Sequence, residues 1–320
     1  MAIDLLSKYR SELMGVSMLM VMIFHTIGGV PIPVVSIKPF ICFDFGVEFF
    51  IILSAIGCTY SLNRDNNISN FYKRRFKRIV PAFIIVATLN FIIYDLILSE
   101  DGDVLLYFKN IFFISFWDGD ISFWFILYIL ICYIFTPYVS KNPNSIILLT
   151  LIGISSTALY LYCFTHSHTQ NVLLYRFPIY FITLSWIYYA RKNNAQWSFV
   201  ILGIFTTAVY ISLILLISYP YKYLLYTLAA IPCLIFIAML IDISGTKRVR
   251  SALSFIGGIS LELYLIHEKC LYLTDMISTN IVFRIVSSFA IAITLSFILH
   301  TLLTKVNLCQ VLALAGKHKS

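Results

Sequence analysis

The chain has 320 residues, of which 60% are hydrophobic and only 12% are charged, and its formal net charge at pH 7 is +8. Soluble domains carry about 25% charged residues, so this composition excludes an ordinary soluble protein. It indicates a polytopic membrane protein, and we treat residues 1–320 as a single transmembrane domain. Seven cysteines are scattered through apolar segments with no C-x-x-C pair, which argues against a disulfide framework and against a zinc site.

Ten apolar segments are long enough to cross a hydrocarbon core of about 30 Å, which takes about 20 helical residues. They predict an all-α bundle of about ten transmembrane helices, over residues 12–31, 40–62, 79–98, 122–140, 145–164, 172–190, 197–218, 222–243, 251–272 and 281–303. Residues 104–117 are interrupted by Lys109 and flanked by aspartates, so they predict an amphipathic or re-entrant segment instead.

Lysine and arginine residues are divided unevenly between the two sides that these spans define. Of the 23, we assign 17 to the side that holds both chain ends and 6 to the opposite side. Because cytoplasmic loops carry an excess of positive charge, we expect both termini in the cytoplasm of a multi-pass protein of the cell (inner, cytoplasmic) membrane. The lipid bilayer is therefore an expected partner, and no segment predicts a nucleic-acid surface.

Three ionisable residues lie deep inside predicted spans, namely His25, Glu48 and His267. A rise of about 1.5 Å per residue places the first two about 18 Å, and His267 about 22 Å, from the cytoplasmic face. Intramembrane ionisable groups usually face a bundle interior or a wet cavity and indicate a functional site. A carboxylate beside His25 would fix its tautomer and suit it to act as a general base. A hydrogen-bonded packing role is the competing interpretation for each residue.

Further polar residues share helical faces with these three, since positions three or four apart lie on one face. Asp44 lies four residues from Glu48, Tyr264 lies three from His267, and Arg10 falls on the face of the first-span histidine. These residues are candidates for lining one cavity.

The basic segment that leads into the third predicted span has two competing explanations. Anchoring to anionic lipid is one, and phosphate binding is the other, since Arg75 and Arg78 are three residues apart and their guanidinium groups can converge on one polyphosphate. Glu262 lies off the His267 face, which favours a structural role. The loop pair His166 and His168 lacks a third ligand, so we predict no metal site there.

Five stretches resemble integral-membrane acyltransferase family 3, the group that O-acetylates cell-envelope glycans. In chain order they are ELMGVSMLMVMIFH, FGVEFFIILSAIG, RRFKRIVP, FWFILYILICYIFTP and FIGGISLELYLIHE. The resemblance spans nearly the whole chain. It implies about ten transmembrane helices, an acyl-CoA donor from the cytoplasm and an acceptor presented from the other side.

The resemblance also implies roles for single residues. His25 matches the family's catalytic histidine, and Glu48 matches an acidic position that is commonly aspartate. Arg75 and Arg78 match paired arginines that are associated with donor binding.

Three other positions bear on the resemblance. Trp124 and His267 fall at family-typical positions and are candidates for lining the cavity. The family usually has arginine or lysine eleven residues before the catalytic histidine, but this chain has Met14 there. Arg10 lies one turn earlier on the same face and is the candidate substitute, as a third donor-binding residue.

Together these inferences predict a membrane-bound O-acyltransferase that moves an acetyl group from cytoplasmic acetyl-CoA to a hydroxyl of a cell-surface polysaccharide or its lipid-linked precursor. His25, oriented by Glu48, would take the hydroxyl proton during direct attack or through an acetyl-histidine. Acetyl-CoA is a substrate here, and we expect no bound cofactor or metal. The alternative is a secondary transporter of a polar solute or proton, which would also place His, Glu and Arg in a midplane cavity.

Overall fold

The structure is a computed structural model that describes residues 2–28, 45–98, 102–120, 122–141, 221–278 and 280–317, together with 176–177, 179–181, 183–184 and 186–187. Across these residues the protein is all-helical, which confirms the predicted fold class. Asp44, His166, His168, the predicted spans 145–164 and 197–218, and most of 172–190 lie outside the described residues.

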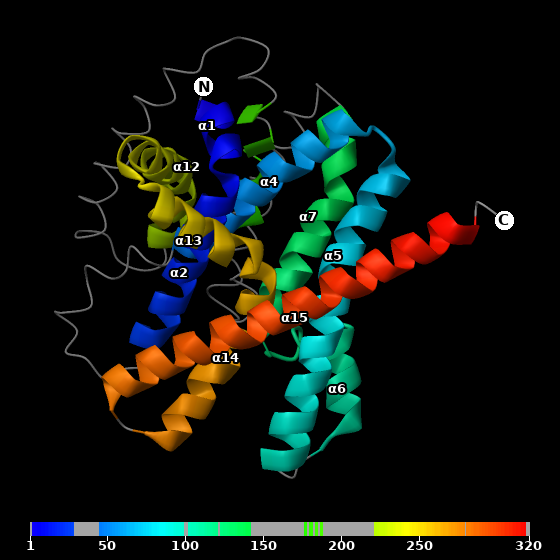
Figure 1. Cartoon of the computed structure of the whole chain (residues 1–320), viewed down its shortest axis with the longest axis vertical. Coiled ribbons are helices and arrows are strands. Elements are labelled where there is room, and N and C mark those ends of the chain that lie inside the picture. Colours follow the sequence, from blue (N-terminus) through cyan, green and yellow to red (C-terminus); the bar gives the residue numbers. More distant parts are fainter. Residues whose placement is uncertain are drawn as a thin grey trace.

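The first half of the chain forms α1 (Ala2–Lys8), α2 (Arg10–Gly28), α4 (Gly46–Arg64), α5 (Ile68–Asn90), the π-helical η2 (Phe91–Leu98) that continues α5, α6 (Val104–Ile111) and α7 (Trp124–Lys141). The second half forms α12 (Tyr221–Ser244), α13 (Lys247–Gly258), α14 (Ser260–Ile277) and α15 (Ile281–Lys317). Figure 1 shows α1 and the turn between α4 and α5 at one end of the molecule, with α6 at the other.

Three of these helices are long and apolar enough to cross a membrane: Gly46–Arg64, Ile68–Leu98 and Val282–Val306. The bent pair α13 and α14 adds a fourth span if the two are counted as one. The described residues thus make this a membrane protein with three or four such helices. The predicted total of about ten, and the cytoplasmic position of both termini, stay predictions.

The predicted span 251–272 is not one continuous helix. It breaks at Ile259, where α13 and α14 meet at an angle of 78°. Two glycines, Gly257 and Gly258, precede the break, and glycine pairs are a common cause of sharp kinks because glycine is a poor helix former. The bend turns α13 away from α14, so that α13 can lie against α2.

The packing of α13 on α2 depends on small residues. A Cβ atom at Gly257 would lie 1.9 Å from the carbonyl oxygen of Ser11, and one at Gly15 would lie 2.0 Å from that of Leu253. Both contacts are far inside van der Waals separation, so only glycine fits. Such small-residue contacts let helix backbones approach closely in membrane proteins. They hold α2, which carries His25, in a fixed position against the C-terminal helices.

The core of the protein is built around α4, whose residues from Phe49 to Ile56 are buried. In contrast, α5, η2, α6 and α15 expose many large apolar side chains, among them Ile97, Leu105, Phe108, Val282 and Leu302. An apolar exterior of this kind suits contact with lipid. The helix α4 therefore forms the protein interior, and the other four elements form its outer wall.

Candidate active site

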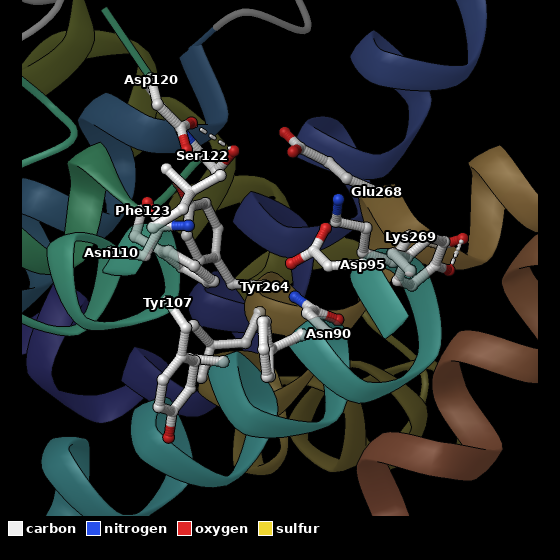
Figure 2. Close-up of a pocket in the computed structure, with 15 residues that line it drawn as sticks. Asn90, Asp95, Tyr107, Asn110, Asp120, Ser122, Phe123, Tyr264, Glu268 and Lys269 are labelled. Carbon is white, nitrogen blue, oxygen red and sulfur yellow. Dashed lines mark hydrogen bonds between the residues drawn. The ribbon is translucent and has the colours of Figure 1, made fainter. Parts of the chain in front are cut away.

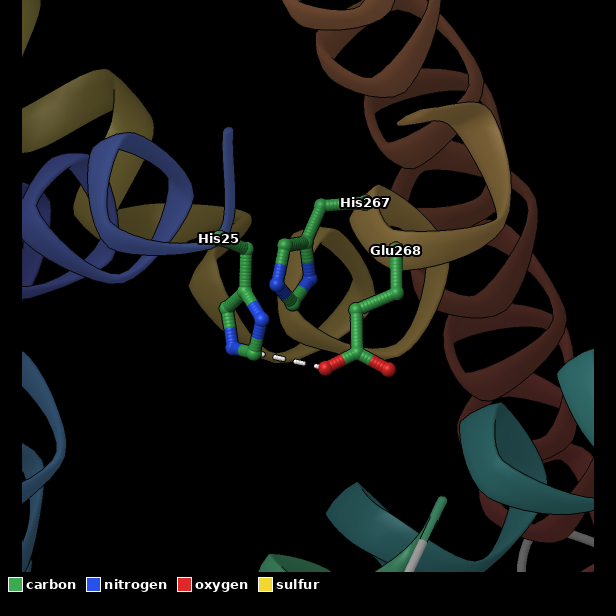
Figure 3. A group of neighbouring side chains, drawn as sticks. All are labelled: His25, His267 and Glu268. Atoms are coloured by element: carbon green, nitrogen blue, oxygen red, sulfur yellow. Dashed lines mark ion pairs between the residues drawn. The ribbon is translucent and has the colours of Figure 1, made fainter. Parts of the chain in front are cut away.

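The histidine in the last turn of α2 meets two residues of α14. The Nε2 atom of His25 lies 3.3 Å from Oε1 of Glu268. Its ring stands edge-on to the ring of His267, with the two centroids 5.1 Å apart (Figure 3). The structure thus brings together the two histidines that the sequence placed at similar depth.

His267 is buried, at 4% exposure, and its backbone contacts fix its tautomer. Its Nδ1 atom lies 2.8 Å from the carbonyl oxygen of Tyr264. A carbonyl can only accept, so Nδ1 carries the proton and donates it, and the lone pair of the neutral ring is on Nε2. Within the described part of the chain, Nε2 has no hydrogen-bond partner. This atom is therefore a buried acceptor whose lone pair no described group uses.

Glu268 is the site residue that the sequence reasoning missed. Both it and His267 fall inside the predicted span 251–272, and an ionisable side chain inside a span was itself a sufficient signal. The carboxylate that contacts His25 is that of Glu268. The residue predicted for this role, Glu48, has a different partner.

Glu48 lies in a buried ion pair. Its Oε1 atom accepts a hydrogen bond of 2.7 Å from Nε of Arg176, and the two side chains are only 2% and 5% exposed. The guanidinium group of Arg176 also lies over the ring of Trp124, 4.8 Å from its centroid. Arg176, which was not a predicted site residue, therefore contacts two residues that were, Glu48 and Trp124.

The candidate donor-binding arginines occupy two places. Arg10 and Arg75 meet at Gly57 of α4, where Nε of Arg10 donates to the carbonyl of Leu53 at 3.1 Å and Nη2 of Arg75 donates to that of Gly57 at 3.0 Å. A Cβ atom at Gly57 would lie 2.8 Å from Nη2 of Arg10, so glycine makes room for the guanidinium group. The ring of Tyr133 lies 5.4 Å from the Arg75 guanidinium carbon.

Arg78 instead reaches α14. Both of its terminal nitrogens bond the carboxylate of Glu262, which is fully buried and also lies 3.1 Å from Nδ1 of His300. The predicted structural role of Glu262 agrees with this pairing. The two candidate donor-binding arginines of α5 therefore bind groups of different helices, Arg75 on α4 and Arg78 on α14.

A polar cavity of about 140 Å³ adjoins the histidines, between α5, η2, the α6 region and α14. Tyr264 and Glu268 line it, together with residues from three other segments (Figure 2). Because Glu268 also contacts His25, the cavity and the imidazole groups belong to one site.

Three side chains of the site, those of His25, His267 and Glu268, also have the composition of a metal site. Each offers one ligand atom, and these atoms lie within 4.8 Å of one another. In a tetrahedral zinc site with bonds near 2.0–2.1 Å, ligand atoms are about 3.4 Å apart, so this group is looser than such a site. An imidazole next to a carboxylate is also the arrangement of a general base and its orienting group. The absence of a metal stays a prediction.

A bundle with long apolar helices, an imidazole–carboxylate pair and an adjoining polar cavity defines a membrane protein with a polar site among its helices. Residues 13–301 match the model of a family described as an acyltransferase domain, and the chain belongs to this family, acyltransferase family 3. The match confirms the resemblance seen in the sequence and does not favour the transporter alternative. Searches of curated proteins and of solved structures found no match to the chain.

Proposed function

We propose that this membrane acyltransferase transfers an acetyl group from cytoplasmic acetyl-CoA to a hydroxyl of a cell-surface polysaccharide or its lipid-linked precursor. The observation that carries the proposal is the contact between His25 and Glu268, a residue that also lines a polar cavity, in a chain of the acyltransferase family. Both side chains are partly exposed, His25 by 36% and Glu268 by 48%, so a substrate can reach them.

In the proposed reaction His25 takes the proton of the acceptor hydroxyl as the hydroxyl oxygen attacks the thioester carbonyl carbon. Glu268 orients the ring and stabilises the imidazolium that forms. The bond between the carbonyl carbon and sulfur then breaks, and the imidazolium returns its proton to the leaving CoA thiolate. The products are an acetyl ester and CoA, and His25 is again neutral.

The donor is proposed to enter from the end of the molecule where α2 begins. Arg10 and Arg75 place two guanidinium groups there, which suits the phosphates of CoA. Arg10 precedes His25 by fifteen residues, or about 22 Å along α2, so the thioester arm must lie along the helix to reach the imidazole. Arg10 thus takes over the role of the basic residue that Met14 replaces. Arg78 is proposed to support the site by holding α5 against α14.

The experiment that tests this function compares the wild type with His25→Ala in the host cell. Ester-linked acetyl groups on the surface polysaccharide are measured by NMR at matched protein levels. The variant is expected to lose them, because no other residue replaces the base. His300→Gln serves as the control, since it replaces a histidine of α15 that contacts Glu262 and does not belong to the proposed site. Unchanged acetylation in His25→Ala would remove His25 from the mechanism.

A further inference from the structure

The cavity beside the histidines is lined by hydrogen-bonding groups of the type that bind hydroxyls. Its polar lining includes Asp95, Asn110, Asp120, Tyr264, Glu268 and Lys269. Carboxylates and carboxamides offer several acceptors and donors at fixed positions, and the aromatic rings offer flat apolar surfaces. A volume of about 140 Å³ has room for several water molecules, and hence for one small polyhydroxylated group rather than a chain.

The cavity adjoins the reacting groups through two residues of α14. Glu268 lines the cavity and lies 3.3 Å from His25, and Tyr264 lines the cavity while its carbonyl holds His267. A group bound in the cavity therefore lies next to Glu268, the residue that contacts His25.

The charge of the lining is negative. Three carboxylates face one ammonium group, that of Lys269, which offsets the charge of Asp95. Asp120 accepts hydrogen bonds only from the backbone and hydroxyl of Ser122 among the described residues, and these leave its charge in place. Figure 2 shows Asp120 and Glu268 on opposite sides of the opening. An anionic ligand would meet repulsion from both sides.

Asn110 gives independent support for a ligand. Its Oδ1 atom is buried and has no hydrogen-bond partner within the described ranges. A buried acceptor without a partner destabilises a fold, so its presence at a cavity indicates that it is satisfied by a bound group.

We propose that this cavity binds the acceptor through a single sugar residue that is uncharged or carries an amino group, and that it rejects acidic sugars. The inference rests on the proposed function and specifies its acceptor. Asp120 and Asn110 select the sugar, and His25 deprotonates the hydroxyl that the cavity presents.

The test uses the full-length protein in detergent and three soluble probes that share one ring: methyl glucoside, methyl glucosaminide and methyl glucuronide. Binding is measured by saturation-transfer NMR. The glucoside and the glucosaminide are expected to bind, and the glucuronide to bind at least tenfold more weakly. Asp120→Asn is expected to reduce this discrimination severalfold. Asp118→Asn is the matched control, since Asp118 lies two residues away, pairs with Lys109 and does not line the cavity.

A second variant separates sugar binding from folding. Asn110→Leu keeps the side-chain size and removes the unsatisfied acceptor, so it is expected to bind the glucoside at least fivefold more weakly while its melting temperature stays equal or rises. Binding of the glucuronide equal to that of the glucoside, no binding of any probe, or unchanged binding in Asn110→Leu would each overturn the proposal.

Consumption of acetyl-CoA that depends on His25 is measured on the same samples. If it persists without sugar binding, the cavity assignment fails and the proposed function stands.

Discussion

Two carboxylates near the centre of the molecule differ in what can reach them. Glu268 is 48% exposed and contacts an imidazole that is also partly exposed. Glu48 is 2% exposed and bonds the equally buried Arg176. Proton transfer to a substrate requires access, whereas a buried ion pair is held for structure. Burial therefore supports the proposed chemical role of Glu268 and favours a structural role for Glu48.

Glu268→Gln tests the first half of this assignment. Gln keeps the shape of the side chain but removes the charge that stabilises the imidazolium, so kcat is expected to fall about 100-fold. The KM for acetyl-CoA and the melting temperature are expected to stay the same. Substitution of a residue with only a structural role would instead lower the melting temperature. Steady-state kinetics with acetyl-CoA, together with a thermal melt, provide the measurement. A wild-type kcat in this variant would exclude Glu268 from the reaction.

Glu48→Gln tests the second half. The change leaves the buried guanidinium of Arg176 without its counter-charge, and breaking such a pair costs about 3–5 kcal/mol. We expect a large drop in melting temperature, read by thermal unfolding in detergent. A variant that is fully stable but inactive would instead return Glu48 to the catalytic centre.

At the scale of the helices, the bend at Ile259 makes the site possible. It lets α13 pack on α2 while α14 carries His267 and Glu268 toward His25. The close approach of α13 and α2 depends on glycine in both helices. Because interfaces of this kind tolerate no added atoms, the position of His25 is coupled to the packing of α13.

Gly257→Ala is predicted to loosen this interface. Its Cβ atom would lie 1.9 Å from the Ser11 carbonyl oxygen, and overpacking of this kind costs about 1–3 kcal/mol. The neighbouring Gly258→Ala is the control, because a Cβ atom there has no neighbour within 4 Å. Thermal melts of the two variants should separate, with only the first destabilised. Equal melting temperatures would show that the two helices are not tightly packed.

The sequence predicted which residues share a depth in the bundle better than it predicted which side chains pair. Depth along the helices correctly grouped His25 with His267, since a regular rise per residue carries over to any packed bundle. It could not reveal the pairing of Glu48 with Arg176, because the two residues are far apart in the sequence and their burial depends on tertiary packing. The break at Ile259 was missed because hydropathy runs on through the glycine pair without change.

At the scale of the whole molecule, the two halves of the proposed reaction lie at different depths. The arginine pair at Gly57 and the imidazole pair are separated by most of the length of α2. Basic side chains gather at the arginine end, where Lys8, Arg64 and Arg74 also lie, which suits a cytoplasmic face. The acidic cavity lies beside the histidines, away from that end.

Arg75→Gln tests the donor half. Loss of one charge-assisted contact is worth about 1.5–3 kcal/mol, so the KM for acetyl-CoA is expected to rise about tenfold or more while binding of the sugar probe is unchanged. Arg74→Gln is the matched control, since Arg74 lies next to it but pairs with Asp65 in the turn before α5. Equal effects of the two variants on KM would indicate that positive charge at this end serves the bilayer rather than the donor.

The most direct measurement of the central claim is the release of CoA from acetyl-CoA by purified protein in vesicles, with the acceptor glycan on the opposite side. Wild-type protein is predicted to release CoA in step with the formation of acetyl ester, and His25→Ala is predicted to do neither. Release of CoA at the wild-type rate by His25→Ala would contradict the account.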